Sequence, residues 1–356
     1  MSAVSHRLES WFNRIWLDAK PPLWLLPIET LFAAVSGLRR WVYASNIRSG
    51  KRLACPVVVV GNLSVGGTGK TPLVCWLVER LREHGYTPGV VTRGYGGSIR
   101  HPHRVRETDD AAAVGDEPVL LARRTSVPVA VGRDRPAAAQ LLIEAGCDVI
   151  VSDDGLQHYA LARDAEIVVV DGERGFGNGH LLPAGPLREG IGRLAQVDAI
   201  VVNGAAVAAA AAAAAAAKPT AGTPVLTMRL QAPVAVPLRG PKPRGLKEFA
   251  GQTVHAIAGI GNPQRFFTML SDAGLEVIAH ELPDHAELHP HSIEFGDGLP
   301  VLMTEKDAVK CCAFAAAQHW YVPVSAAFEA DEGRVLLRIV TRLIERGKAP
   351  KGQQHG

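Results

Sequence analysis

A glycine-rich segment that ends in a lysine and a threonine carries the clearest chemistry in the sequence. Residues 64–71 read S-V-G-G-T-G-K-T, the phosphate-binding pattern G-x-x-x-x-G-K-[ST] with Ser64 in place of the first glycine. The glycines let backbone N–H groups turn inward around a phosphate, Lys70 can reach the β- and γ-phosphates, and Thr71 can bind Mg²⁺. The pattern therefore predicts a cradle for ATP, formed by Ser64, Val65, Gly66, Gly67, Thr68, Gly69, Lys70 and Thr71.

The flanking residues favour a nucleotide site over a glycine-rich turn that binds nothing. The apolar run 56–60 precedes the segment as a buried strand would, and residues 72–84 follow it with helical spacing of apolar side chains. Strand, loop and helix in this order direct the positive end of the helix dipole at the phosphates.

A pair of aspartates, Asp153 and Asp154, directly follows the apolar run 148–152. Two carboxylates at the end of a buried strand are costly to hold unless a cation or a donor is near. A Mg²⁺-nucleotide site usually draws a carboxylate from a neighbouring strand. We therefore expect one or both to bind Mg²⁺, with N-capping of a following helix by Asp154 as the alternative.

A second acidic pair, Asp116 and Glu117, stands between Gly115 and Pro118 at an expected helix start. Such a pair can supply a catalytic base and a metal ligand. Acidic residues also favour helix N-termini for electrostatic reasons alone, so the pattern by itself leaves both explanations open.

The elements that must hold these residues alternate between strands and helices. This alternation predicts an α/β fold with a P-loop NTPase-like, mostly parallel sheet covered by helices on both faces, plus a smaller C-terminal α/β domain. The expected strands are 56–60, 87–92, 127–131, 148–152, 167–170, 254–258, 275–280 and 299–304, and the expected helices are 72–84, 117–122, 137–145, 263–273 and 332–346.

Composition divides the chain into five expected parts. They are an N-terminal helical, membrane-associated segment at 1–52, a P-loop domain at 53–218, a proline- and glycine-rich hinge at 219–245, a C-terminal α/β domain at 246–347 and a disordered tail at 348–356. The alanine tract at 205–217 can form a helix by propensity but carries no functional motif.

The N-terminal segment is basic, apolar and rich in tryptophan. Residues 1–52 contain eight basic and three acidic side chains, a net charge of +5, and four of the six tryptophans. Residues 21–38 contain one charged side chain, Glu29, but three prolines and a length near the lower limit of about 18–20 residues make them a poor spanning helix. We expect a helix in a membrane interface, and the alternative is a helical hairpin packed on the next domain. No secretory signal is expected, because residues 1–20 lack an unbroken apolar stretch.

The overall composition argues against two classes of protein. A net charge of +3 over 356 residues is too small to suggest nucleic-acid binding. The five cysteines are odd in number and contain no CxxC pair, so a disulfide framework is not expected and a reducing compartment fits better.

Seven short motifs occur in the order typical of one family. They are SVGGTGKTP (64–72), TRGYGG (92–97), GDEP (115–118), DDGLQH (153–158), GPLRE (185–189), PDH (283–285) and TEKDAVK (304–310). In this order they resemble the tetraacyldisaccharide 4′-kinases of lipid A biosynthesis, over about residues 20–340. Ser64 belongs to that family's own version of the P-loop.

The resemblance implies an activity and a location. The activity is transfer of the γ-phosphoryl group of ATP to the 4′-hydroxyl of a tetraacylated glucosamine disaccharide 1-phosphate, which forms lipid IVA. The implied cofactors are ATP and Mg²⁺. The implied partners are the acylated disaccharide and a membrane surface, with no nucleic acid and no obligate protein partner. The implied location is the cytoplasmic face of a bacterial inner membrane, where the protein is peripheral or singly anchored.

The resemblance also implies residue roles. Asp116 would act as general base together with His285, and Mg²⁺ would be served by Glu117 and by Asp153 or Asp154. The acceptor or phosphate site would be lined by Arg93, Tyr95, Arg135, Gln157 and Arg188. Arginine suits this task because its planar fork bonds two oxygens, although each of these arginines could instead form a structural ion pair. Because Asp116 and His285 fall in different expected domains, the two would act together only when the domains close over the substrate.

Two other functions stay open on the residues alone. A P-loop GTPase or metallochaperone-type switch protein also uses GGTGKT, but that class usually carries metal-binding Cys or His clusters. A membrane-surface scaffold that has lost catalysis would not need Lys70, Thr71, Asp116 and Asp154.

Two smaller patterns have structural explanations. His285, His289 and His291 follow no strict zinc-binding motif, so a zinc site is not expected. Residues 304–307 are similar to the base-reading segment [NT]KxD, but we expect a strand-to-helix turn that Asp307 caps.

Overall fold

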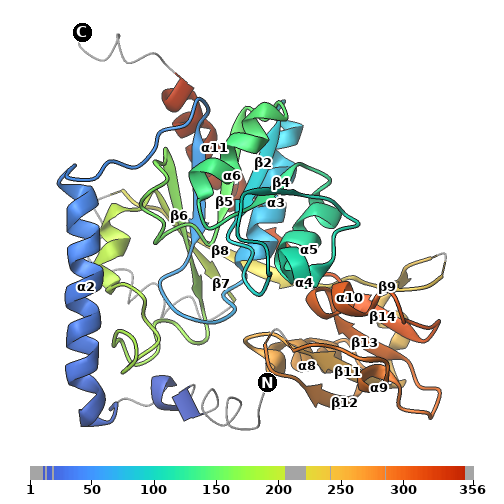
Figure 1. The fold of residues 1–356 in the computed structure, drawn as a ribbon. Helices are drawn as coiled ribbons and strands as arrows, with labels where there is room; N and C mark the ends of the chain where they lie inside the picture. Colours follow the sequence, from blue (N-terminus) through green and yellow to red (C-terminus); the bar gives the residue numbers. More distant parts are fainter. Residues whose placement is uncertain are drawn as a thin grey trace.

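The computed structural model describes residues 11–12, 14–17, 20–204, 222–240, 242–284 and 286–348. Within these residues the chain forms two β-sheets, each covered by helices, with one long helix standing beside the first of them (Figure 1). The alanine tract, His285 and residues 349–356 lie outside the described residues, so the expectations for them remain predictions.

The first unit is built on a nine-stranded sheet. The strands from β8 to β4 in the sheet order are parallel to one another, and an antiparallel strand closes each edge, β15 on one side and β3 on the other. In sheet order the strands are β15 (Ser325–Phe328), β8 (Val225–Gln231), β7 (Ala199–Asn203), β6 (Ala165–Asp171), β1 (Val57–Gly61), β5 (Val149–Asp153), β2 (Pro88–Thr92), β4 (Val129–Val131) and β3 (His103–Val105). The mostly parallel sheet is confirmed, with β1 in its middle and β5 as its direct neighbour.

Helices cover both faces of this sheet, as alternation of strands and helices predicts. One face packs on α3 (Lys70–Glu83), α5 (Asp116–Thr125) and α11 (Ala330–Lys348), whose apolar sides are buried with every second residue of β1, while the short α4 (Ala111–Val114) sits beside α5. The other face packs on α6 (Arg135–Glu144) and on the loops that carry η2 (Ile191–Gln196). Each Val or Leu side chain buried fully in this way stabilises the fold by roughly 1.5–3 kcal/mol.

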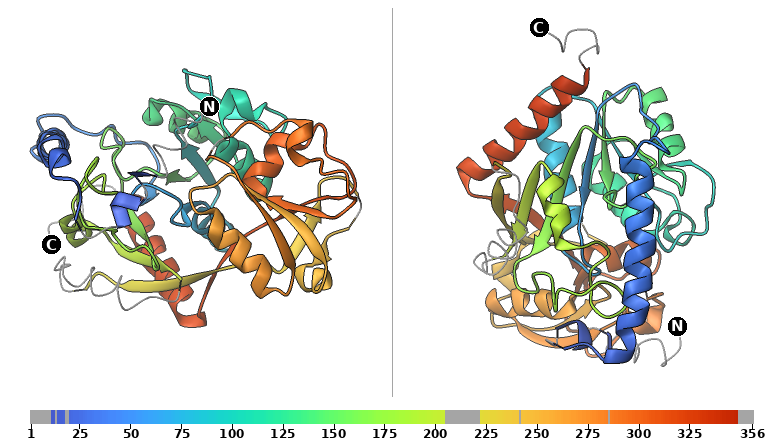
Figure 2. Two further views of the ribbon diagram at one scale, coloured as in Figure 1. Left: turned by 90° about the horizontal axis from the view of Figure 1, so that it is seen from below. Right: turned by 90° about the vertical axis from the view of Figure 1, so that its left-hand side faces the viewer.

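The second unit is a smaller six-stranded sheet with its own core (Figure 2). In sheet order the strands are β10 (Arg244–Gly245), β9 (Val234–Pro237), β14 (His319–Val322), β13 (Val301–Thr304), β11 (Thr253–Ala258) and β12 (Glu276–Glu281). One face packs on η3 (Leu246–Phe249) and α8 (Pro263–Asp272), and the other on α9 (Pro290–Ile293) and α10 (Glu305–Cys311). This is the smaller α/β domain that the sequence predicts.

The boundaries between the units differ from the expected ones. The expected hinge at 219–245 contains β8, which belongs to the first sheet, and β9, which belongs to the second. The expected C-terminal domain at 246–347 ends in β15 and α11, which pack on the first unit. The apolar run that predicts α11 is correct, but its partner is the first sheet because β15 pairs with β8, Ser325 opposite Gln231. The chain therefore crosses between the units twice, after β8 and after β14.

The N-terminal helix α2 (Leu26–Ala44) follows η1 (Leu23–Leu25) and contains no buried residue. Figure 1 shows it beside the first unit, on the side away from the second sheet. Exposed apolar side chains follow one face of η1 and α2 at helical spacing: Trp24, Ile28, Leu31, Val35, Leu38 and Trp41. None of the helices in the described part of the chain combines the length and the apolar character needed to cross a bilayer.

The one acidic residue of the apolar stretch fastens α2 to the first unit. The Leu181 N–H donates to Glu29 Oε1 at 2.7 Å, and the imidazole of His180 lies 2.9 Å from Glu29 Oε2 through its Nδ1. One side of the helix is thus tied to the protein while the opposite side stays apolar and exposed. The segment therefore packs on the first unit, and its place in a membrane interface stays a prediction.

Candidate active site

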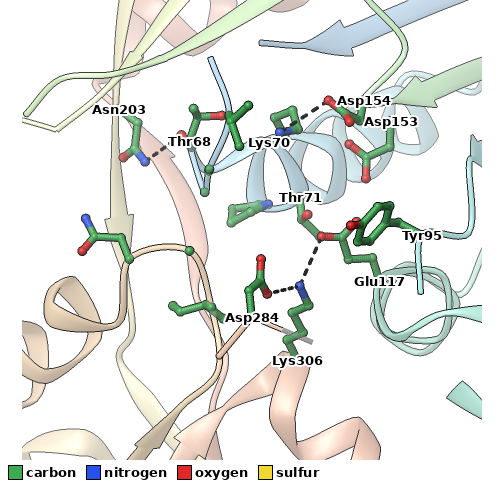
Figure 3. Close-up of a pocket in the computed structure, with 18 of the residues that line it drawn as sticks. Thr68, Lys70, Thr71, Tyr95, Glu117, Asp153, Asp154, Asn203, Asp284 and Lys306 are labelled. Atoms are coloured by element: carbon green, nitrogen blue, oxygen red, sulfur yellow. Dashed lines mark hydrogen bonds and ion pairs between the residues drawn. The ribbon is translucent and has the colours of Figure 1, made fainter. Parts of the chain in front are cut away.

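A cleft of about 1510 Å³ opens between the two units and contains most of the predicted site residues. Its walls come from the loop before α3, the ends of β5 and β7, the start of α5 and one side of α2 in the first part of the chain. The opposite wall comes from the loop before α8 and the start of α10 (Figure 3). Residues 65–71 of the phosphate cradle, Glu117, Asp153 and Asp154 therefore line this one cleft, whereas Ser64 and Asp116 do not.

The predicted cradle is a tight loop between β1 and α3. Gly66 and Gly69 have φ angles of 109° and 90°, which L side chains rarely adopt, so the glycines are needed to close the turn. Lys70 is the first residue of α3, and the N-terminus of that helix faces the cleft. Ser64 lies behind the loop, where its backbone bridges to Leu187.

Two buried asparagines that the sequence patterns did not single out hold the cradle in shape. Asn62 donates from Nδ2 to the Ser64 carbonyl at 2.7 Å, and Asn203 donates from Nδ2 to the Thr68 carbonyl at 3.0 Å. Asn62 follows β1 closely and Asn203 is the last residue of β7. A polar amide at the end of a buried apolar strand was the signal available in the sequence. These two hydrogen bonds therefore fix the backbone at both ends of the cradle.

Asp153 and Asp154 end the neighbouring strand β5, as the parallel pairing of β1 and β5 requires, but their surroundings differ. Burial alone would raise the pKa of Asp154, yet Lys70 at 3.5 Å and Arg188 at 3.0 Å outweigh it and hold this pKa well below its usual range. Burial, reinforced by the charge of Glu117, raises the pKa of Asp153 to about 7. No described residue donates a hydrogen bond to the buried Oδ1 of Asp153.

These oxygen atoms fit a magnesium ion that a nucleotide helps to hold. Asp153 offers a buried oxygen without a partner among the described residues, and Thr71, Glu117 and Asp154 line the same cleft. No group of three His, Cys, Asp or Glu side chains in the described ranges is gathered closely enough to bind a metal by itself. Mg²⁺ does not need such a group, since one or two carboxylates, water and the substrate phosphates commonly complete its shell.

The acidic pair at the start of α5 meets lysines from the second unit. Glu117 lines the cleft, and its Oε1 lies 3.7 Å from Lys306 Nζ. Lys306 also donates to Asp284 Oδ1 at 2.8 Å (Figure 3). Burial alone would lower the pKa of Lys306, but Glu117 and Asp284 raise it on balance, so this side chain stays a cation.

Asp116 points toward α10, where its Oδ2 lies 3.5 Å from Lys310 Nζ and its side chain is 13% exposed. The predicted partner of Asp116, His285, lies outside the described residues, although the adjoining Asp284 lines the cleft.

The five residues expected on the acceptor side all line the cleft, in different environments: Arg93, Tyr95, Arg135, Gln157 and Arg188. Arg93 and Tyr95 are exposed, while Arg188 is paired with Asp154. Gln157 donates to the Asn62 carbonyl at 3.1 Å and so also supports the cradle. Burial lowers the pKa of Arg135 to about 10, and its Nη1 donates to Ser152 Oγ at 3.4 Å.

The loop that precedes α8 lies directly on the cradle, which no sequence pattern indicated. A Cβ atom on Gly261 would lie 2.9 Å from the Gly67 nitrogen, so only glycine fits there. Arg174 donates from Nη1 to the Gly261 carbonyl at 3.3 Å, and Arg265 of α8 pairs with Asp171 at the end of β6. The second unit therefore covers the phosphate loop of the first.

Two structural explanations from the sequence need correction. Asp154 caps no helix, because residues 154–164 contain none before β6 begins. Asp307 does not cap α10 either. The cap is Thr304, whose hydroxyl accepts from the Asp307 N–H at 3.2 Å. Asp307 is instead fully buried and accepts a hydrogen bond from the Gly259 N–H at 2.8 Å, which ties the start of α10 to the loop on the cradle.

Comparison with known proteins gives one consistent result. A family model described as tetraacyldisaccharide-1-P 4′-kinase matches residues 22–342. A curated tetraacyldisaccharide 4′-kinase from Aromatoleum aromaticum is 51% identical over 319 residues, 89% of this chain and 93% of the relative. Another, from Alkalilimnicola ehrlichii, is 52% identical over 327 residues, 87% of this chain and 91% of the relative.

A crystal structure of LpxK from Aquifex aeolicus in complex with ATP is similar to this fold. It is 26% identical in sequence, has a TM-score of 0.74 and covers 90% of this chain and 98% of its own. The likeness therefore extends over both units and not over the P-loop domain alone.

Proposed function

Since the chain belongs to the tetraacyldisaccharide-1-P 4′-kinase family, we propose that it transfers the γ-phosphoryl group of ATP to the 4′-hydroxyl of a tetraacyldisaccharide 1-phosphate. The product would be lipid IVA, in lipid A biosynthesis. The observation that carries this proposal is the common cleft, which is lined by the P-loop, Glu117, Asp153, Asp154 and one side of α2, with Asp116 next to Glu117 at the start of α5. A GTPase-type switch does not account for that helix or for the family match.

The cradle binds and orients the triphosphate. Backbone N–H groups of residues 65–71 would bind the β-phosphate, and Lys70 would neutralise charge that develops on the γ-phosphate. Mg²⁺, when bound, would neutralise charge on the phosphates during transfer. Thr71, Glu117, Asp153 and Asp154 would hold it. Asp153 is the better direct ligand, because Asp154 already pairs with Lys70 and Arg188.

Asp116 is the proposed general base. As the 4′-oxygen forms its bond to the γ-phosphorus, its proton moves to the Asp116 carboxylate and the bond between the γ-phosphorus and the bridging oxygen breaks to release ADP. His285, which follows Asp284 in the chain, would orient the Asp116 carboxylate, as the family resemblance implies.

The acceptor would enter from the side of α2. Arg93, Tyr95, Arg135, Gln157 and Arg188 offer polar contacts to its sugars and phosphate, while Phe32 and Val35 of α2 give the cleft an apolar side suited to acyl chains. The exposed apolar face of α2 continues from there, which supports a peripheral site on the cytoplasmic face of the inner membrane.

The test is phosphorylation of a defined lipid. Purified protein with labelled ATP, Mg²⁺ and vesicles that contain the tetraacyl disaccharide 1-phosphate should produce labelled lipid IVA. Hydrolysis of GTP with no labelled lipid would instead favour the switch protein.

Substitution of the base refines this test. Asp116→Ala should lower kcat on the order of 10²–10⁴-fold while ATP still binds, since only proton transfer is impaired. Asp331→Ala is the control, because that side chain is 92% exposed on α11, far from the acidic pair in sequence. Unchanged kcat in Asp116→Ala would remove Asp116 from the mechanism.

A further inference from the structure

Two lysines of α10 reach from the second unit to the acidic pair that begins α5. Lys306 and Lys310 are four residues apart, so they project from one face of their short helix. That helix packs against α5. The proposed reaction gives neither lysine a task, although both contact the residues that carry it.

Lys310 is held in place from its own unit. Its Nζ lies 3.1 Å from Asp307 Oδ1, and Asp307 is fully buried. The other carboxylate oxygen of Asp307 accepts from the Gly259 N–H at 2.8 Å and from the Thr304 hydroxyl at 2.5 Å. A fixed carboxylate therefore fixes the ammonium group, which lies 3.5 Å from Asp116 Oδ2 and belongs to a side chain only 8% exposed.

Lys306 connects the two units at the level of the cleft. Its Nζ donates to Asp284 in the second unit at 2.8 Å and lies 3.7 Å from Glu117 in the first, and its side chain is 12% exposed. Figure 3 shows Lys306 between these two carboxylates, below the cradle. Lys306 thus contacts Glu117 and Lys310 contacts Asp116, and these two acids are neighbours at the start of α5.

We propose that Lys306 and Lys310 are positioning residues, which orient the carboxylates of Glu117 and Asp116 when the second unit rests on α5. The inference rests on the proposed roles of these two acids. A carboxylate on the first turn of a helix can rotate about its side-chain bonds, whereas a base must lie within about 2.6–3.2 Å of the proton it takes. Neither lysine exchanges a proton in the reaction.

Removal of the Lys310 charge measures its effect on chemistry separately from binding. Lys310→Met keeps the length of the side chain but not its charge, and we expect kcat to fall about 10–100-fold, because a displacement near 1 Å costs on the order of 10²-fold. The affinity for ATP, measured by calorimetry, and the KM for the lipid should change less than about twofold. Lys310→Arg should recover part of the loss because it restores the charge. Lys306→Met should act in the same direction.

A matched control distinguishes orientation of the two carboxylates from mere stabilisation of the contact between the units. Glu305→Gln weakens the ion pair with Arg124, 2.6 Å long, in the same contact between α10 and α5, but leaves Asp116 and Glu117 with their lysines. If Glu305→Gln and Lys310→Met lower kcat and the melting temperature equally, the lysine only holds the units together and the inference is wrong.

A double variant tests whether Lys310 acts through Asp116. In the Asp116→Ala background, Lys310→Met should lower kcat no further, whereas independent effects would multiply. A large loss in Asp116→Ala with normal kcat in Lys310→Met would overturn the inference and leave the proposed base intact. Normal kcat in Asp116→Ala would overturn both.

Discussion

The two walls of the cleft are built by different means. The first-unit wall at the nucleotide is a backbone loop, shaped by glycines and held by Asn62 and Asn203 from strands of the same sheet. The facing wall belongs to the second unit, and its side chains form ion pairs with the first unit. The side chains that it contributes are those of Arg265, Glu305, Lys306 and Lys310.

This difference separates binding from chemistry. The residues of the phosphate cradle all belong to the first unit, although the loop before α8 lies over them. The acidic pair, in contrast, reaches its described arrangement only against α10. Substitutions in α10 that disturb this arrangement should therefore lower kcat more than they lower the affinity for ATP.

The largest effect on kcat is expected from Lys70, the side chain of the first wall that is proposed to contact the transferred phosphoryl group. Lys70→Ala should lower kcat on the order of 10³-fold, because it removes a positive charge from the developing charge on the phosphate. The fold should survive, since Asp154 keeps Arg188 as a partner at 3.0 Å. Steady-state kinetics measures the loss, with the exposed Lys247→Ala as control. A loss of kcat below tenfold would show that the backbone N–H groups of the loop stabilise the transferred phosphate without Lys70.

Asp153 lines the cleft at the end of β5, and its replacement should lower activity but raise the stability of the metal-free protein. Its pKa in the folded protein, about 7, exceeds the ordinary value near 3.9, so the folded state binds the proton more tightly. Metal-free protein should therefore lose stability as pH rises from about 4 to 7.

Asp153→Asn should remove that loss and so be more stable than the natural protein at pH 8 in EDTA. The same variant should lose about 10²-fold in kcat, and Mg²⁺-ATP should stabilise it less. Melting curves at several pH values check the sign. A natural protein whose stability rises between pH 5 and pH 8 relative to Asp153→Asn would contradict the buried, proton-binding carboxyl.

Gly261→Ala should change nucleotide binding from the second wall. The added Cβ would lie 2.9 Å from the Gly67 nitrogen, where the neighbour is backbone and cannot rotate aside. We expect the affinity for ATP to fall about tenfold, which corresponds to roughly 1.4 kcal/mol, with a smaller change in kcat. Gly192→Ala is the matched control, because its added Cβ meets nothing within 4 Å. Equal affinities in the two variants would mean that the loop does not cover bound ATP.

The smallest effect on either wall is expected from charges on the outer face of α2. Leu31→Glu with Leu38→Glu should leave the melting temperature and ATP affinity unchanged, because both side chains are exposed. Flotation with anionic vesicles should show several-fold weaker binding. Val335→Glu with Ile278→Glu introduces the same charges at exposed apolar sites elsewhere. Equal flotation of both double variants would contradict a membrane-facing α2.

The sequence predicted the first wall better than the second for a physical reason. A P-loop is local, since its turn, its lysine and its helix follow one another, and the strand that precedes it is a continuous apolar run. Asp153 and Asp154 were also identified from a local pattern, because they directly follow the apolar run 148–152. Lys306 and Lys310 are far from Asp116 in sequence, and only the packing of α10 on α5 joins them.

Some strands were missed because they are short and only partly buried, as the edge strand β15 and the inner strand β9 are. Without β15, the return of the chain to the first sheet after β14 could not be anticipated. The expected C-terminal boundary of the second unit, at residue 347, therefore lies beyond β15 and α11. The apolar pattern of α11 predicts a helix but not the sheet on which it packs.

The pairing of Gln231 with Ser325 has a consequence for the architecture of the family. The second unit enters and leaves at adjacent residues of two antiparallel strands, which makes it a module inserted at the tip of a hairpin. A tight turn could replace it without changing the order of any strand around the phosphate loop. The second unit could therefore be exchanged or redesigned as one cassette, while the first unit keeps the sheet that carries the phosphate loop.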